Sequence, residues 1–378
     1  MKPELRFLEF EENWSYKKLK DLLKVHSGRD YKHLQPGEIP VYGTGGYMLS
    51  VSDYLSNDDA IGIGRKGTIN KPYLLKAPFW TVDTLFYCIP REEVDLYFLL
   101  SLFKKINWEK YDESTGVPSL SKVNIEKLKV YSCELEEQRK IGDFFSKLDQ
   151  QIELEEQKLA KLEEQKKGYM QKIFTQELRF KDKNGNAYTN WRTIELKNIL
   201  EKIVDNRGKT PDNSSSEKYP LLEVNALGYY HPSYKKVSKF VSESTYNNWF
   251  REHLKENDIL FSTVGNTGIV SLMDGYKAVI AQNIVGLRVN SNNLPAFVYY
   301  MLSYWENQKK IKRIQMGAVQ PSVKVSQFKF IKYLVPIKDE QEKIANLLSE
   351  IDKIINKQLI KIELLKQRKK GLLQKMFI

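Results

Sequence analysis

One phrase in this chain is written twice, and its repetition constrains the fold more than any other feature. Residues 165–174 read QKKGYMQKIF and residues 368–377 read RKKGLLQKMF, a displacement of 203 positions. At the same displacement, Glu137–Phe174 and Glu340–Phe377 share 15 identities over 38 ungapped positions. A register held over that length indicates an internal duplication. The chain is therefore predicted to contain two copies of one unit.

A second, weaker repeat shows where the two copies differ in length. Asn13-Trp14 recurs as Asn190-Trp191 at a displacement of 177, and Pro118-Ser119 recurs as Pro321-Ser322 at 203. The second copy is therefore longer than the first, and its extra residues lie in its front part. We expect two divergent fronts, each followed by a similar back. The predicted parts are residues 1–136, 137–177, 178–339 and 340–378.

Composition and charge narrow the class of protein. Hydrophobic residues make up 41% of the chain and charged residues 29%, as in soluble globular proteins. No apolar run reaches the length of a membrane span, and the start, MKPELRFLEFEENW, has no apolar signal segment. Two cysteines, Cys88 and Cys133, favour structural burial in a reducing cytoplasm. Of the net charge of +12, residues 178–339 carry +10, which favours a nucleic acid as partner.

Both backs repeat apolar residues with the heptad spacing of long helices. Polar residues interrupt the pattern at matching places, Glu155 and Lys166 in the first back and Gln358 and Lys369 in the second. Each helix either packs on its own front or pairs with the other helix. We favour an antiparallel coiled coil, because matching interruptions suit a self-complementary seam and would fix its register. The predicted seam consists of Ile141, Phe145, Leu148, Ile152, Leu159, Leu162, Ile344, Leu348, Ile351, Ile355, Ile362 and Leu365.

The fronts read as mixed α/β domains. Short apolar runs separated by Gly, Asn and Asp turns predict strands within residues 37–51, 58–75 and 79–90, and within 217–230, 256–273 and 278–290. Residues 17–25 and 194–203 are each predicted to form a short amphipathic helix. A helical stretch is expected to close each front, at 95–106 and at 295–314. The fold class is thus α+β, with two pseudo-repeated α/β domains, each followed by a long helix.

Residues for catalysis or metal binding do not cluster in the sequence. His26, His33, His231 and His253 are scattered, without Cys or carboxylate residues at the spacing of metal ligands. The Gly-rich stretches GTGGY and GRKGT match neither the P-loop nor the dinucleotide-binding pattern. No catalytic residue and no metal site is therefore expected in this chain.

The Gly-rich stretches instead suit an approach to DNA. Glycine lets the backbone come close to a groove wall, while Arg and Asn offer paired donors to guanine and adenine edges. The plainer interpretation of any one such stretch is a tight turn with solvated charges. Four positive charges within residues 309–313 suit phosphate contacts. The residues predicted to contact DNA are Arg29, Tyr42, Thr44, Tyr47, Arg65, Lys66, Thr68, Ser114, Thr115, Ser119, Arg207, Lys209, Asn225, Thr263, Asn266, Thr267, Asn283, Lys309, Lys310, Lys312, Arg313, Gln320, Ser322 and Lys324.

Taken together, these motifs resemble the specificity subunit of Type I restriction–modification systems. The resemblance rests on the paired EQxKI sequences at Glu137–Ile141 and Glu340–Ile344 and on the loops Ser114–Ser119 and Gly317–Ser322. It covers essentially the whole chain. In the first loop Ser114 replaces the usual leading glycine, and the Pro-Pro expected before each EQ pair is reduced to Pro336 in the second copy and is missing from the first.

The resemblance implies a division of labour between this chain and partner subunits. Residues 1–136 and 178–339 would be target-recognition domains, each reading one half of a split double-stranded DNA sequence, and the helices would hold them at a fixed spacing. Two methyltransferase subunits would bring S-adenosylmethionine, and a restriction and translocase subunit would use ATP and Mg²⁺. The chain itself would bind no cofactor and no membrane. Two other classes stay open: a coiled-coil scaffold whose fronts bind protein, and an independent enzyme.

Overall fold

The duplication in the sequence is also a duplication of topology. The computed structural model describes residues 1–206 and 208–378, which divide into one unit of residues 1–158 with 359–378 and a second unit of residues 159–358. The predicted DNA contact of Arg207 therefore lies outside the described residues. The division into four parts expected from the sequence differs from this one, because each unit contains part of both long helices. That four-part division stays a prediction.

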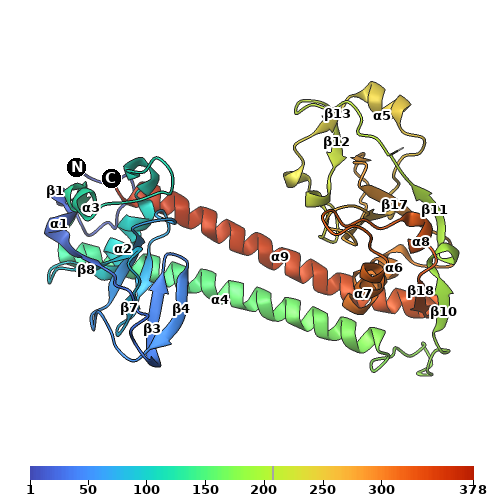
Figure 1. The fold of residues 1–378 in the computed structure, drawn as a ribbon, viewed down its shortest axis with the longest axis horizontal. Helices are drawn as coiled ribbons and strands as arrows, with labels where there is room; N and C mark the ends of the chain where they lie inside the picture. The colour runs from blue at the N-terminus through green and yellow to red at the C-terminus, as the bar shows by residue number, and fades with distance from the viewer. Residues whose placement is uncertain (207) are drawn as a thin grey trace. The chain divides into compact units, whose positions relative to one another are not determined.

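The first unit is built mainly of short strands (Figure 1). Its elements before the long helix are β1 (Ser15–Lys18), α1 (Leu19–Leu22), β2 (Leu23–Ser27), β3 (Pro36–Gly43), β4 (Gly46–Val51), β5 (Ala60–Gly64), β6 (Tyr73–Leu75), β7 (Trp80–Thr81), β8 (Leu85–Pro90), α2 (Leu96–Lys105), a 3-10 helix (Trp108–Tyr111), α3 (Lys122–Lys127) and β9 (Lys129–Ser132). The strands form a four-stranded sheet β2-β8-β5-β6, a three-stranded sheet β4-β3-β7 and a ribbon β1-β9.

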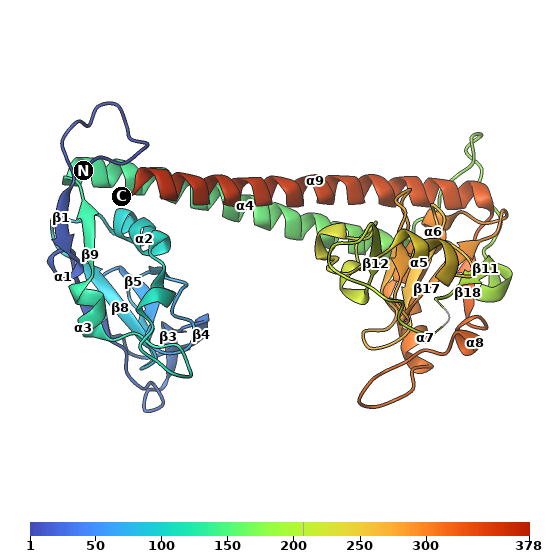
Figure 2. The ribbon, with the colours of Figure 1, turned by 90° about the horizontal axis from the view of Figure 1, so that it is seen from above.

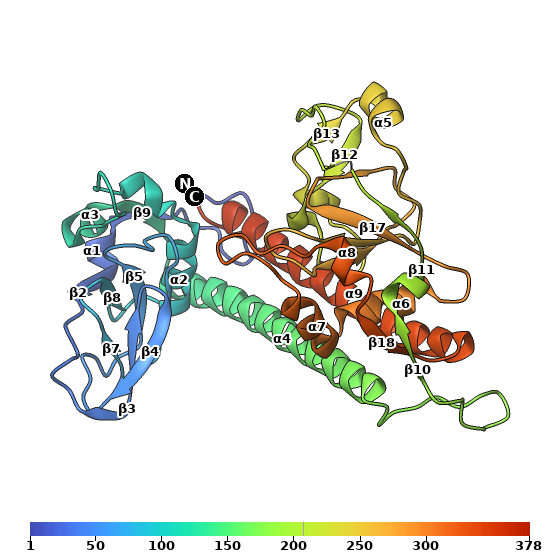
Figure 3. The same cartoon turned by 45° about the vertical axis from the view of Figure 1, so that its right-hand side comes forward.

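The second unit repeats this plan with different sequences (Figure 3). Between the two long helices, its strands and α-helices are β10 (Arg192–Glu195), β11 (Leu200–Val204), β12 (Tyr219–Leu222), β13 (Phe240–Val241), α5 (Glu243–Trp249), β14 (Ile259–Ser262), β15 (Val270–Leu272), β16 (Val279–Ile280), β17 (Ile284–Val289), α6 (Pro295–Ser303), α7 (Trp305–Arg313), α8 (Val325–Phe328) and β18 (Lys332–Val335). Short 3-10 helices lie at Leu196–Asn198, Val224–Ala226 and Tyr234–Lys236. The sheets β11-β17-β14-β15 and β13-β12-β16 and the ribbon β10-β18 match those of the first unit strand for strand.

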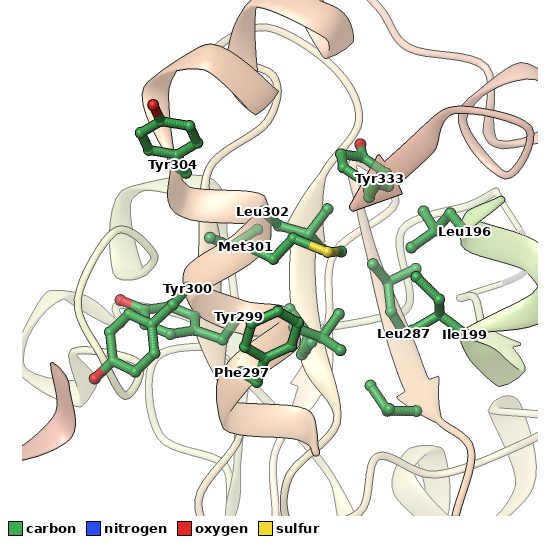
Figure 4. Close-up of a cluster of buried hydrophobic side chains, with 14 of the residues drawn as sticks. Leu196, Ile199, Leu287, Phe297, Tyr299, Tyr300, Met301, Leu302, Tyr304 and Tyr333 are labelled. Atoms are coloured by element: carbon green, nitrogen blue, oxygen red, sulfur yellow. The ribbon is translucent and has the colours of Figure 1, made fainter. Parts of the chain in front are cut away.

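The core of the second unit lies between helix α6 and the larger sheet. Figure 4 shows Phe297, Met301 and Leu302 of α6 facing Leu287 of β17, and all four side chains are fully buried. Every residue of β17 is buried, as is expected of a strand that lies in the middle of a sheet with cover on both faces. In the first unit α2 takes the place of α6 and packs against β5 and β8.

Two local predictions of helix were wrong. Residues 17–25 and 194–203 form strands interrupted by a single helical turn, and only Leu19–Leu22 is an α-helix. In β2 the side chains of Leu23 and Val25 are buried while Lys24 is exposed, an alternation that suits pairing with β8. The expected helix at 295–314 is broken at Tyr304, whose ψ of 126° is extended. The strands predicted elsewhere in the two fronts are confirmed.

The long helices are α4 (Leu135–Phe174) and α9 (Lys338–Met376), drawn in green and red in Figure 2. Within the first unit, the start of α4 shares a hydrophobic cluster with the end of α9, including Phe145 and Met376. Within the second unit, the start of α9 shares a cluster with the end of α4, including Leu348 and Ile173. The pairing is therefore antiparallel in each unit. Each helix also packs on a front domain, so both arrangements considered from the sequence are present.

Ion pairs at equivalent positions support this register. Lys369 pairs with Asp149 in the first unit, and Lys166 pairs with Asp352 at 2.6 Å in the second. The displacement of the repeat relates each residue of one pair to its counterpart in the other. The predicted polar breaks Lys166 and Lys369 thus contact the partner helix. All twelve predicted seam residues are buried or half-buried.

A buried ion pair ties a preceding segment to the start of each long helix. The Arg6 guanidinium donates to both carboxylate oxygens of Glu137 at 2.7 Å, and Trp14 Nε1 donates to the same carboxylate at 3.2 Å. Arg179 and Trp191 hold Glu340 in the same way, at 2.7, 2.9 and 3.1 Å. Sequence reasoning missed both arginines, although ELRF occurs twice, at residues 4–7 and 177–180.

Candidate nucleic-acid interface

In the first domain, two loops predicted to contact DNA are joined by backbone hydrogen bonds. The Gly67 N–H donates to the Pro118 carbonyl at 2.8 Å, and the Leu120 N–H donates to the Arg65 carbonyl at 2.9 Å. Gly67 has a φ of +88°, which favours glycine at this turn. The Gly-rich turn 64–68 and the Pro-Ser loop 112–120 therefore form one ordered surface, here called the first reading surface.

The second domain contains the same frame. The Gly265 N–H donates to the Pro321 carbonyl at 2.8 Å, and the Val323 N–H donates to the Thr263 carbonyl at 2.8 Å. Gly265 also has a positive φ, +77°. The turn 262–268 and the loop 315–323 are the second reading surface. Identical backbone bonds in two divergent sequences show that the frame is shared while its side chains vary.

The shared bonds fix which residues of the two turns correspond. Arg65 takes the place of Thr263, and Thr68 takes the place of Asn266, because Gly67 and Gly265 make the same bond. Judged by residue type alone, Arg65-Lys66 would correspond to Asn266-Thr267. The backbone hydrogen bonds show that this correspondence is wrong. The first surface thus presents two positive charges where the second presents neutral side chains. A shared frame with different chemistry is what two readers of different DNA sequences require.

The charged side chains of the first reading surface, Arg65 and Lys66, face solvent. The Arg65 backbone N–H donates to the Thr84 carbonyl at 2.8 Å, whereas its exposed guanidinium makes one long bond of 3.5 Å to the Asp83 carbonyl. Lys66 is exposed and pairs through its backbone with Ser119. The structure brings Thr68, Ser114 and Thr115 onto the same two loops. The Arg65 guanidinium also lies over the Phe86 ring, 5.8 Å from its centroid. A fixed backbone that carries exposed, charged side chains suits direct contact with DNA.

The β3–β4 hairpin adds aromatic residues beside the first surface. The Thr44 hydroxyl lies 3.9 Å from where a Cβ on Gly67 would stand, so the hairpin tip adjoins the Gly-rich turn. Tyr42 and Tyr47 lie edge to face with ring centroids 6.4 Å apart, and 63% of Tyr47 is exposed. Arg29 is exposed, and its backbone is anchored through Thr81 and Trp80 on β7, which pairs with β3.

On the second surface most predicted contact residues support the turn and few face solvent. Thr263 and Thr267 are each only 7% exposed, and the Thr267 hydroxyl accepts a hydrogen bond from the Gln315 amide. The backbone N–H of Thr263 donates to the carbonyl of Asn283 at 2.8 Å. Asn266 is the exposed residue of the turn, and its carbonyl accepts from the Ser262 hydroxyl at 2.7 Å. The amide of Asn266 is therefore the better candidate for base contact.

Of the remaining predicted residues of the second domain, Gln320 and Ser322 lie on the loop of the second reading surface, and the others lie outside that surface. Gln320 and Lys324 are exposed on or beside the Pro-Ser loop, and Ser322 is half-buried in it. The Asn225 amide donates to the Lys236 carbonyl at 3.3 Å, which places Asn225 in a separate turn. Lys209 accepts a hydrogen bond from Asn206 through its carbonyl, and its side chain is exposed.

The basic cluster on α7 divides into two pairs. Lys309 is held by Glu306 at 2.8 Å, and Lys310 donates to the Lys332 carbonyl at 3.1 Å while burial lowers its pKa. Lys312 and Arg313 are exposed, and Arg313 borders an open cleft of about 610 Å³. Helix α7 lies against the second surface, because Gln308 Nε2 donates to the Gly268 carbonyl at 2.8 Å. Lys309 is also exposed, but its charge already pairs with Glu306, so Lys312 and Arg313 are the better placed for phosphate contacts.

We expect the double change Lys312→Gln with Arg313→Gln to reduce the salt dependence of DNA binding. The slope of log K against log salt falls by about 1 for each phosphate that the protein no longer neutralises. The control is Lys309→Gln with Lys310→Gln, which removes the same charge from side chains already held by protein groups. Binding titrations at several salt concentrations measure both slopes. Equal slopes for the two double variants would contradict the assignment.

Metal-binding and membrane-spanning features are absent from the described part of the chain. No group of three or more His, Cys, Asp or Glu side chains that could hold a metal ion occurs among residues 1–206 and 208–378. In the same residues, none of the helices combines the length and the apolar character that crossing a membrane requires. Cys88 and Cys133 are both buried with free thiols.

Comparison with known protein families also finds two copies of one unit in this chain. The family model for the Type I restriction modification DNA specificity domain matches this chain twice, over residues 11–164 and 188–364. Two specificity subunits of Methanocaldococcus jannaschii are similar in sequence. The type I restriction enzyme MjaVIII subunit is 26% identical over 276 residues, or 69% of this chain and 64% of that one. The MjaX subunit is 28% identical over 200 residues, or 51% and 47%. The chain thus aligns with about half to two thirds of each relative's length.

Two solved structures share the fold. The S subunit of a Type I restriction–modification system from M. genitalium superimposes with a TM-score of 0.67 at 16% identity, covering 100% of this chain and 99% of that one. A chain from a structural study of complex assembly and conformational transition in the type I system gives a TM-score of 0.54 at 15% identity, covering 97% and 98%. These likenesses confirm the expected fold class.

Proposed function

Because this chain belongs to the family of Type I restriction modification DNA specificity domains, matched twice over most of its length, we propose that it selects the DNA sequence on which a restriction–modification complex acts. Each front domain reads one half of a split double-stranded sequence. The observation that carries this proposal is the pair of reading surfaces, which share their backbone bonds but differ in side chains. The net charge of +12 favours association with the phosphate backbone.

The division of labour between subunits is part of the proposal. Two methyltransferase subunits bind the chain and bring S-adenosylmethionine, while a restriction and translocase subunit uses ATP and Mg²⁺. The complex works in the cytoplasm. The chain itself contributes recognition and no catalysis. A coiled-coil scaffold whose fronts bind only protein is less well supported, because neither the family match nor the exposed Arg65 and Lys66 would be expected of it.

The long helices are proposed to set the gap between the two half-sites. An uninterrupted α-helix rises about 1.5 Å per residue. Helices α4 and α9 contain 40 and 39 residues, and neither is interrupted by proline. The ion pairs Lys166–Asp352 and Lys369–Asp149 fix the register of the pairing in each unit. If two reading domains are connected by a helix, a change in helix length changes the distance between them. A flexible linker of changed length would not fix that distance.

Selection from a random double-stranded DNA library tests the proposal. The chain, assembled with the methyltransferase subunit of its own system, is expected to enrich a sequence of two defined blocks separated by a gap of fixed length and undefined sequence. Enrichment of one continuous block would contradict the assignment of one reader to each half. Binding without any enrichment would favour the scaffold.

A further inference from the structure

The residue that organises the first reading surface lies outside the set predicted from the sequence. Asp112 follows the 3-10 helix Trp108–Tyr111, and its N–H donates to the Glu109 carbonyl at 3.3 Å. Trp108 is 1% exposed and donates through Nε1 to the Phe103 carbonyl at 2.8 Å. Asp112 therefore stands on a turn that is anchored in the core of the domain.

The Asp112 carboxylate closes the Pro-Ser loop from one side. A single oxygen, Oδ1, accepts hydrogen bonds from the Ser114 N–H at 2.9 Å and from the Ser119 N–H at 2.8 Å. The Glu113 N–H donates to the Ser119 carbonyl at 3.0 Å. The backbone N–H bonds from Ser119 and then Ser114 lower the pKa of Asp112, so the carboxylate is charged at neutral pH.

The tip of the loop, at Gly116 and Val117, makes little packing contact with the rest of the domain. Val117 is 65% exposed, and a Cβ added at Gly116 would meet nothing within 4 Å. Ser119, which Asp112 holds, is bridged by its backbone to Lys66. Ser119 therefore links the Asp112 carboxylate to the charged turn 64–68 of the first reading surface.

The second domain closes the equivalent loop without an ionised group. Gln315 lies at the position aligned with Asp112, and its amide reaches Thr267 on the Gly-rich turn. The loop itself is closed by two backbone bonds between Met316 and Ser322, at 2.9 and 2.8 Å. The carboxylate clamp therefore belongs to the first domain among the two reading surfaces described.

We propose that Asp112 is a positioning residue for DNA recognition: it accepts two backbone hydrogen bonds that close the Pro-Ser loop, whose backbone is in turn bonded to the Arg65–Thr68 turn, and so sets the base preference of the first half-site. The inference rests on the proposed function. Without the acceptor, Ser114 and Ser119 lose a shared partner, and Ser119 is the residue whose backbone is bridged to Lys66.

Two substitutions distinguish the role of Asp112 as a hydrogen-bond acceptor from the role of its negative charge. Asp112→Ala removes both, whereas Asp112→Asn removes the same charge but keeps an oxygen that can accept both N–H groups. Random-library selection is carried out with the full chain and its methyltransferase partner. We expect Asp112→Ala to lower discrimination in one half of the split sequence about ten-fold or more, the scale of one mismatched base pair. Asp112→Asn is expected to stay within about two-fold of the wild type.

The outcomes distinguish this inference from the proposed function. If the wild-type chain enriches no split sequence, the proposed function fails. If the wild type enriches one and Asp112→Ala keeps the full preference in both halves, or relaxes both halves alike, the positioning role fails. Equal losses for Ala and Asn would assign the effect to charge and would also overturn it. Thermal melting of each variant identifies global unfolding, which would relax both halves.

Discussion

Replacing Arg179 with alanine is expected to lower the free energy of unfolding of the second unit by about 3–5 kcal/mol, the usual cost of leaving a buried charge without its partner. The Glu340 side chain is fully buried, and Arg179 meets its carboxylate with two hydrogen bonds of 2.7 and 2.9 Å. Among the described residues, the donor left for the carboxylate would be Trp191 Nε1. Denaturant unfolding, followed by a probe in the second unit, measures the loss.

The matched control is Lys353→Ala in the same unit. Lys353 pairs with Glu350 at 2.6 Å, but both side chains are 65% exposed, so the loss should stay below about 1 kcal/mol. Both changes remove one positive charge, so a difference between them reports burial and geometry. Arg179→Lys should fall between the two, because lysine keeps the charge but not the two-pronged contact. Equal losses for Arg179→Ala and Lys353→Ala would contradict the account of the junction.

Removing one heptad from each long helix is expected to abolish methylation of the original DNA target. Deleting residues 155–161 and 358–364 shortens each helix by about 10 Å and keeps the heptad phase. DNA rises about 3.4 Å per base pair, so the preferred gap should shrink by up to about three pairs. The deletion lies between the two ion pairs and spares Lys369–Asp149 and Lys166–Asp352, so the register of each unit is kept.

A deletion in only one helix is the control for this experiment. It removes half as many residues but leaves the two helices unequal, so we expect it to disrupt pairing and lower thermal stability, whereas the double deletion should keep a cooperative transition. Methylation of targets with gaps shortened by one to four pairs is then compared with the original. If the folded double variant binds its methyltransferase partner and still methylates the original target at the original rate, the helices do not set the gap.

The duplication and the long helices could be predicted because their signals are local and repeated. The constant displacement between the two copies locates the Pro-Ser loops and both helices, and the heptad pattern identifies the seam. The predictions of a helix at 17–25 and at 194–203 were wrong, because helical and strand periods cannot be told apart over such short stretches. Pairing with β8 and β17 decides in favour of strands, and those partners lie far away in sequence.

The reading surfaces could be predicted only in part from the sequence. Gly-rich turns with exposed Arg65, Lys66 and Asn266 could be identified from residue type. Their correspondence could not, because it depends on which carbonyl each glycine N–H meets. Thr263 and Thr267 have the chemistry of contact residues, but burial gives them a supporting role. Asp112 was missed because its role lies in the backbone groups it accepts from, which only the folded loop brings together.

The central claim is that each front domain reads its own half of a split DNA sequence. Replacing residues 190–317 with the corresponding domain of another family member, and sequencing the methylated bases in cells that also express the methyltransferase subunit, tests it directly. The account predicts that one half of the methylated sequence changes while the other half and the gap stay the same. A change in both halves, or in neither while methylation persists, would contradict it.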